Sequence, residues 1–152
     1  MPTYVCSISP NTLTDEQKTQ IAVAIGKRHS EATGAHPFFV QVEIDENPGR
    51  TRYLGGSPAN AHIWIRGDIR AGRSDEARQQ LMLSIMRDVA SITGLKEQDI
   101  WIYLCNLAPI DMVEYGHVLP PPGGERVWFE NLPDELKTYL IGLGVQQQNF
   151  RL

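Results

Sequence analysis

Two arginines three positions apart, Arg70 and Arg73, precede a segment with the features of a helix start. A guanidinium group makes two parallel hydrogen bonds to a carboxylate, and the positive end of a helix also favours anions. The pair therefore predicts a binding site for a small carboxylate. The alternative is a pair of surface arginines bridged to nearby acids such as Asp68 or Asp75, and the spacing alone does not exclude it.

Pro2 suggests a second kind of chemistry at the start of the chain. A small second residue permits removal of Met1, which would leave a free secondary amine on Pro2. An α-amino group titrates near about 8, and neighbouring arginines or burial lower that pKa toward the working range of an acid–base catalyst. The alternative is that Pro2 only begins a strand, where its missing N–H costs nothing.

An internal repeat supplies the elements that must position these residues. Residues 14–34 align with residues 74–94, a spacing of 60 positions, and both segments share an Asp-Glu pair near the start and Thr-Gly at the end. Each begins with a hydroxyl residue suited to the N-cap, carries apolar residues at helical spacing and closes on a glycine. The repeat predicts two equivalent helices.

Strand-like segments flank each predicted helix, at residues 2–9 and 38–45 and at residues 62–69 and 99–107. The chain is therefore predicted to contain two β-α-β units, residues 2–46 and 61–108. Right-handed crossovers place both helices on one face of a four-stranded sheet, an α/β (α+β) architecture. The first and third strands are expected to be antiparallel neighbours in its centre.

Residues 109–152 have no counterpart in the repeat and are predicted to be a C-terminal extension. It should contain a short hairpin within residues 109–122 and a helix over residues 133–143, entered at a proline. Since no linker or low-complexity run interrupts the chain, residues 1–152 are expected to form a single domain. The segments 63–65 and 100–104 are apolar on both strand faces, so a second face of the sheet is expected to be covered by a closed homo-oligomer.

Positions at which the two repeats differ are candidates for function, because features that the repeats share serve the fold. Arg70, Arg73, His29 and Pro2 all occupy such positions. In the predicted topology the start of the first strand lies near the end of the third, which brings Pro2 toward Arg70. The last turns of the first helix return His29 to the same place.

The composition argues against several classes of partner. The chain has 14 Lys and Arg residues, 18 Asp and Glu residues and no basic block, which disfavours nucleic acid or an anionic membrane as partner. Its longest apolar runs, such as residues 21–25, are far shorter than the roughly 20 residues of a membrane span, and the N-terminus lacks a signal-peptide pattern, so a cytoplasmic location is expected. Two cysteines and four histidines without metal-ligand spacing predict neither a disulfide framework nor a metal site.

Scattered motifs, in order along almost the whole chain, resemble the tautomerase superfamily and within it the cis-3-chloroacrylic acid dehalogenase-like group. These motifs are Met-Pro-x-Tyr at the N-terminus, His29, Tyr53-Leu-Gly-Gly56, Arg70-x-Gly-Arg73-Ser74, Trp101-Ile-Tyr103, Met112-Val-Glu-Tyr-Gly116, Leu119-Pro and Trp128-Phe-x-Asn-Leu132. The resemblance implies a tautomerase (4-oxalocrotonate tautomerase-like) fold and a homotrimer. It also implies an active site made of Pro2, His29, Arg70, Arg73, Tyr103 and Glu114.

By that resemblance the two arginines bind and polarise a substrate carboxylate with help from His29, Glu114 with Tyr103 activates water, and a protonated Pro2 donates a proton to carbon. The implied reaction adds water to a small unsaturated carboxylic acid such as cis-3-haloacrylate, with loss of halide and formation of malonate semialdehyde, and it needs no metal or organic cofactor. From the residues alone, Tyr103 would be a packing residue and Glu114 a solvated acid.

Two other functions stay open at this stage. A neutral Pro2 would act as a base, so that the protein would be a keto–enol tautomerase of 2-keto acids such as phenylpyruvate. Alternatively, the chain would be a non-catalytic oligomeric binding protein with the same fold, since a fold does not determine a function. Retention of Met1 would favour this last possibility, because it blocks the amine.

Overall fold

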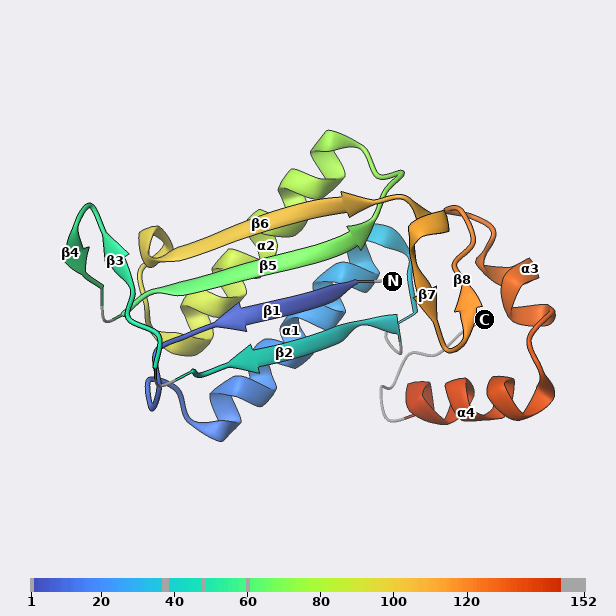
Figure 1. Cartoon of the computed structure of the whole chain (residues 1–152), viewed down its shortest axis with the longest axis horizontal. Helices are drawn as coiled ribbons and strands as arrows, with labels where there is room; N and C mark the ends of the chain where they lie inside the picture. Colours follow the sequence, from blue (N-terminus) through green and yellow to red (C-terminus); the bar gives the residue numbers. More distant parts are fainter. Residues whose placement is uncertain (1, 37–38, 48, 60, 146–152) are drawn as a thin grey trace.

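A mixed four-stranded sheet is the centre of the molecule (Figure 1). The computed structural model describes residues 2–36, 39–47, 49–59 and 61–145 of the chain. The strands β1 (Thr3–Ser7), β2 (Gln41–Asp45), β5 (Ile63–Arg70) and β6 (Ile100–Leu107) lie in the order β2-β1-β5-β6. β1 is parallel to β2 and antiparallel to β5, and β5 is parallel to β6. The predicted sheet and its antiparallel central pair are confirmed.

The helices α1 (Asp15–Thr33) and α2 (Asp75–Thr93) lie on the same face of this sheet, as predicted (Figure 1). Their ends follow the local sequence. Thr14 and Ser74 accept hydrogen bonds from the backbone three residues later, at 3.1 and 3.2 Å. Gly34 and Gly94 close the helices with φ angles of 70° and 74°, which glycine adopts without strain.

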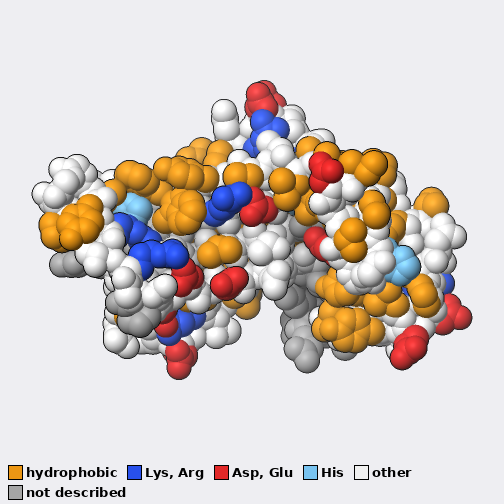
Figure 2. Space-filling view, viewed as in Figure 1, with side chains coloured by type: hydrophobic (Ala, Val, Ile, Leu, Met, Phe, Trp, Pro, Cys, Tyr) orange, Lys and Arg blue, Asp and Glu red, His pale blue; other side chains and the backbone are white. Residues whose placement is uncertain are grey.

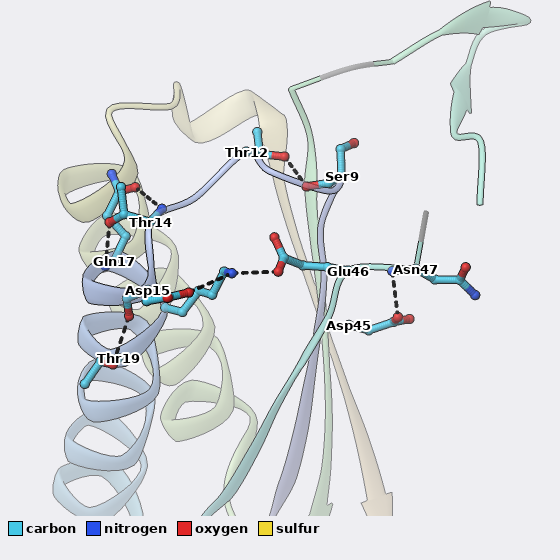
Figure 3. A network of polar contacts seen from close by, with 10 residues as sticks. Ser9, Thr12, Thr14, Asp15, Gln17, Thr19, Asp45, Glu46 and Asn47 are labelled. Carbon is cyan, nitrogen blue, oxygen red and sulfur yellow. Dashed lines mark hydrogen bonds and ion pairs between the residues drawn. The ribbon is translucent and has the colours of Figure 1, made fainter. Parts of the chain in front are cut away.

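Polar contacts fix the start of α1 against the end of β2 (Figure 3). The Thr14 backbone N–H donates to the Gln17 side chain at 3.0 Å, which completes a capping box. Lys18 pairs with Asp15 at 3.2 Å and with Glu46, just beyond β2, at 2.6 Å. The first helix is therefore attached to its own strand by charge as well as by packing.

An ion pair also joins the two helices. Arg28 on α1 donates to both carboxylate oxygens of Asp88 on α2, from Nε at 2.7 Å and from Nη2 at 3.0 Å. These two residues occupy equivalent positions of the repeat, since 88 is 28 plus the spacing of 60. The local pseudo-twofold axis therefore passes through a pair of opposite charges.

The main core lies between the sheet and the helices. Apolar residues recur at intervals of four on both helices, as in Leu81, Ile85 and Val89, and alternate on the strands, so that one face of each element is buried. Burial of this apolar surface is the main contribution to stability. The central buried residues are Tyr4, Cys6, Ile21, Ile25, Ile63, Ile65, Ile69, Leu81, Ile85, Val89 and Ile100.

The face of the sheet opposite the helices is partly apolar. Figure 2 views this face and shows hydrophobic side chains over much of it, interrupted by charged groups. Trp101 and Tyr103 on β6 are 43% and 51% exposed, and the Tyr103 ring packs edge-on against Trp64 of β5 at a centroid distance of 5.9 Å. Arg66 and Asp68 form an ion pair at 3.0 Å on the same face. Both faces of β5 and β6 therefore carry apolar side chains, as their sequences predict.

The extension after β6 packs on its own small core at one end of the sheet (Figure 1). After the 3-10 turn η3 (Pro109–Asp111), β7 (Val113–Glu114) and β8 (His117–Val118) form the predicted hairpin. The predicted last helix is α4 (Asp134–Val145), whereas α3 (Glu125–Glu130) was not predicted. The buried residues of this second core are Phe39, Met112, Leu119, Leu132 and Leu140.

Two further elements lie outside the repeats' main strands and helices. β3 (Tyr53–Leu54) and β4 (Ser57–Pro58) form a hairpin at the end of the sheet far from the extension (Figure 1). A 3-10 turn, η2 (Glu97–Asp99), leads into β6. Among the helices of the described residues, none has the length and apolar character needed to cross a membrane.

Candidate active site

A small cavity lies at the end of the sheet that carries the extension. There the start of β1, the end of β5 and the last turns of α1 meet (Figure 1). The cavity volume is about 10 Å³, which is roughly the space for one water molecule. Four of the candidate residues share this cavity, whose lining consists of Pro2, His29, Thr33, Ala35, Arg70 and Arg73.

His29 is held in the cavity wall as a neutral ring. It is only 4% exposed, and its Nδ1 lies 2.9 Å from the hydroxyl of Tyr4, whose ring is also buried. Burial, followed by the positive charge of Arg73, lowers the pKa of His29 to about 3. Burial raises the pKa of the Tyr4 hydroxyl above its ordinary value, so this group keeps its proton. Tyr4 was not a sequence candidate, because a strand tyrosine among apolar residues indicates packing.

Arg70 is buried and already holds a carboxylate. Its exposed fraction is 7%, Nη1 donates to the Pro120 carbonyl oxygen at 2.7 Å, and Nη2 forms an ion pair with Glu125. The alternative that it bridges surface acids such as Asp68 or Asp75 is wrong. Those two acids pair with other arginines, at positions 66 and 78, because β5 turns Arg70 toward the extension.

Glu125 is the functional candidate that sequence reasoning missed. It is the first residue of α3, where an acid is usually solvated and serves the helix end. Burial raises its pKa, but hydrogen bonds from backbone amides and from Arg70 outweigh this, and the net pKa of Glu125 is lowered. The carboxyl group therefore stays ionised beside Arg70.

Arg73 has fewer hydrogen-bond partners than Arg70 among the described residues. Burial and the charge of Arg70 lower the pKa of its guanidinium group. Its Nε is buried and has no hydrogen-bond partner among the described residues. Arg73 and Thr33 also line a second, wide cavity of about 650 Å³, together with His36, Phe39, Glu125 and Phe129. Arg73 thus stands between the small cavity at Pro2 and a space large enough for an organic acid.

Glu114 and Tyr103 are not brought to the small cavity within one chain. Glu114 on β7 lines a separate cavity of about 680 Å³ that also contacts Thr3 and Gln41, the residues next to Pro2 along the chain and across the sheet. Tyr103 alternates with Ile102 and Leu104, which are partly buried against the main core, and so lies on the sheet face opposite the helices. The described residues contain no cluster of His, Cys, Asp and Glu that could bind a metal ion.

Comparison with known proteins shows the family to which the chain belongs. Residues 1–131 match the family described as putative oxalocrotonate tautomerase enzyme. The chain is a member of the tautomerase superfamily.

Within this superfamily the chain belongs to the cis-3-chloroacrylic acid dehalogenase-like group. The crystal structure of N1, a member of the cis-3-chloroacrylic acid dehalogenase (cis-CaaD) family, is 30% identical, with a TM-score of 0.88, over 92% of this chain and 99% of that chain. The predicted family and fold are confirmed.

Other solved structures share the fold at lower identity. A fused 4-OT described as a symmetric trimer is 20% identical, with a TM-score of 0.70, over 77% of this chain and 94% of that chain. A second fused 4-OT, an asymmetric trimer, is also 20% identical, with a TM-score of 0.70, over 76% of this chain and 94% of its own. No functionally curated protein matches the chain.

Proposed function

We propose that the protein catalyses the Pro2-dependent addition of water to small unsaturated carboxylic acids, including cis-3-haloacrylates. With a haloacrylate, the adduct loses halide and becomes malonate semialdehyde. The supporting observation is the convergence of Pro2, His29, Arg70 and Arg73 on one cavity. The likeness to N1 over nearly the whole chain supports the same assignment.

The roles follow from the chemistry of these groups. A guanidinium group bound to the carboxylate withdraws electron density along the conjugated system, which makes the β-carbon electrophilic. Water attacks that carbon after losing a proton to a carboxylate base, for which Glu114 is proposed with help from Tyr103. The amine of Pro2, free once Met1 is removed, supplies a proton to the α-carbon.

The neutral state of His29 restricts its role. A ring with a pKa of about 3 carries no charge at neutral pH, so it does not compete with the arginines as a cation. When the Tyr4 hydroxyl donates to Nδ1, the ring proton resides on Nε2. His29 then acts as a neutral hydrogen-bond donor toward the bound carboxylate, positioned by Tyr4.

A keto–enol tautomerase is the second candidate, and one observation favours it. Within one chain, Glu114 and Tyr103 are absent from the lining of the cavity that contains Pro2. Tautomerisation moves a proton within the substrate and needs only a base such as neutral Pro2 together with an arginine for the carboxylate. The hydratase reaction additionally needs the water-activating carboxylate.

The proposed function is tested with mature protein whose loss of Met1 is verified by intact mass. A panel of cis- and trans-3-haloacrylates, propiolate-type acids and phenylpyruvate is assayed for malonate semialdehyde and for enol conversion. We expect turnover of the unsaturated acids and its loss in Pro2→Ala, which replaces the cyclic secondary amine. Turnover of phenylpyruvate alone would assign the tautomerase function instead, and no turnover of any of these acids by the Met1-free protein would indicate a binding protein.

We further propose that the working form is a homotrimer that buries the apolar sheet face. Light scattering should give three times the chain mass of 17.1 kDa at micromolar concentration. Trp101→Arg places a charge on that face and should dissociate the assembly. Val23→Arg is the matched control, because Val23 is 58% exposed on α1, away from this face. A monomeric wild-type protein would contradict the assembly.

A further inference from the structure

The guanidinium group of Arg70, which would bind a substrate carboxylate, already makes hydrogen bonds to other groups of the protein. One terminal nitrogen pairs with Glu125 and the other donates to the Pro120 carbonyl oxygen at 2.7 Å. Only 7% of Arg70 is exposed, so no second face of this guanidinium group is open to solvent. A substrate carboxylate therefore cannot reach Arg70 while Glu125 occupies it.

The available space leads to the same conclusion. The cavity at Pro2 measures about 10 Å³, whereas a three-carbon acid needs room for several heavy atoms. The neighbouring cavity of about 650 Å³ is large enough, and Glu125 forms part of its wall. Glu125 thus lines the wide cavity and is bonded to Arg70, which lines the small cavity. If Glu125 moved away from Arg70, the two cavities would be joined.

The extension sits directly on the loop that carries the arginines. Gly72, between Arg70 and Arg73, has a φ of 110°, and a Cβ built there would lie 2.6 Å from Cγ of Pro122. Only glycine allows this approach. The segment that leads into α3 is therefore seated against the arginine loop, and Glu125 follows three residues after the contact.

Arg73 provides the place where an incoming acid can first bind. Its Nε is buried without a hydrogen-bond partner among the described residues, and the side chain lines both cavities. A buried donor that lacks an acceptor is unfavourable, so a carboxylate arriving through the wide cavity gains a bond at no loss of another.

Building on the proposed function, we propose that Glu125 competes with the substrate carboxylate for Arg70. The substrate opens the site when its carboxylate replaces that of Glu125 on Arg70. The exchange substitutes one carboxylate for another on the same guanidinium group, so the charge of Arg70 stays paired throughout. Only ionised acids can perform it. Glu125 therefore selects carboxylates against neutral amides and esters of the same size.

The test measures binding of propionate, a saturated acid that cannot be hydrated, by NMR titration of the mature protein. Glu125→Gln keeps the size of the side chain and removes its charge, and we expect the Kd for propionate to fall by about tenfold. Glu135→Gln is the matched control, because Glu135 is an exposed acid in the first turn of its helix, α4, and lines neither arginine cavity. It should change the Kd by less than twofold.

A second variant keeps the test decisive if Glu125→Gln fails to fold. Glu125→Asp retains the charge but shortens the reach toward Arg70, and it should also lower the Kd, by a smaller factor. Unchanged or weaker propionate binding in the folded variants would overturn the competitor role and show that Glu125 orients Arg70. Absence of propionate binding in every variant would overturn the proposed carboxylate site itself, which separates the two failures.

Discussion

Arg73→Ala is expected to lower kcat/KM for unsaturated carboxylates by about a hundredfold or more. The lost charge-assisted bonds contribute on the order of 1.5–3 kcal/mol, and the substrate also loses its orientation at Pro2. Since Arg73 has an unpaired Nε in the resting protein, the variant should unfold at nearly the wild-type temperature. Steady-state kinetics and thermal unfolding check both statements.

Arg70→Ala is the informative companion, because the two arginines have different surroundings. It should lose activity as well, but it also leaves Glu125 beside an empty site, which costs on the order of 3 kcal/mol of unfolding free energy. Arg87→Ala serves as the control, since Arg87 is exposed on α2 and lines neither arginine cavity. Near-normal kinetics in Arg73→Ala and Arg70→Ala would refute the carboxylate site.

Glu114→Gln is expected to separate the two enzymatic functions. Hydration needs a base that takes a proton from water, and the amide of glutamine keeps the size of the side chain without its basicity. Hydration and dehalogenation should fall by a factor on the order of 100 or more, while any phenylpyruvate tautomerase activity is largely retained. Malonate semialdehyde formation and enol conversion are measured on the same preparation.

Glu97→Gln is the control for this experiment, because it removes the charge of an exposed acid in η2 that lines neither the Glu114 cavity nor the arginine cavities. It should leave both activities close to wild type. Equal loss of both activities in Glu114→Gln, with the oligomer intact, would mean that Glu114 supports the site generally. The water-activating role would then be withdrawn.

The repeat made most of the fold predictable, because its signals are local. Hydroxyl N-caps, helical apolar spacing and closing glycines specify α1 and α2 without reference to distant residues. Once two β-α-β units are recognised, their topology brings the ends of β1, β5 and α1 together, and Pro2, His29 and Arg70 share these ends. The proximity of these three residues could therefore be predicted from the sequence.

The remaining parts of the site depend on contacts between residues far apart in the sequence, and no local sequence pattern predicts such contacts. Glu125 meets Arg70 across 55 positions of sequence, and as the first residue of a short helix it has the pattern of an ordinary solvated acid. Tyr4 holds His29 through a hydroxyl that the apolar pattern of β1 does not reveal. Two glycines with positive φ form the β3–β4 hairpin between segments too short to show strand periodicity.

The ion pair between Arg28 and Asp88 shows how far the two halves of the chain have become complementary. Two copies of the first unit, assembled about the same axis, would oppose arginine with arginine, and two copies of the second would oppose aspartate with aspartate. Like charges at this distance repel, whereas the covalently joined halves attract. Each half of the chain is thus matched in charge to the other half, and neither could pair with a copy of itself at this position without repulsion.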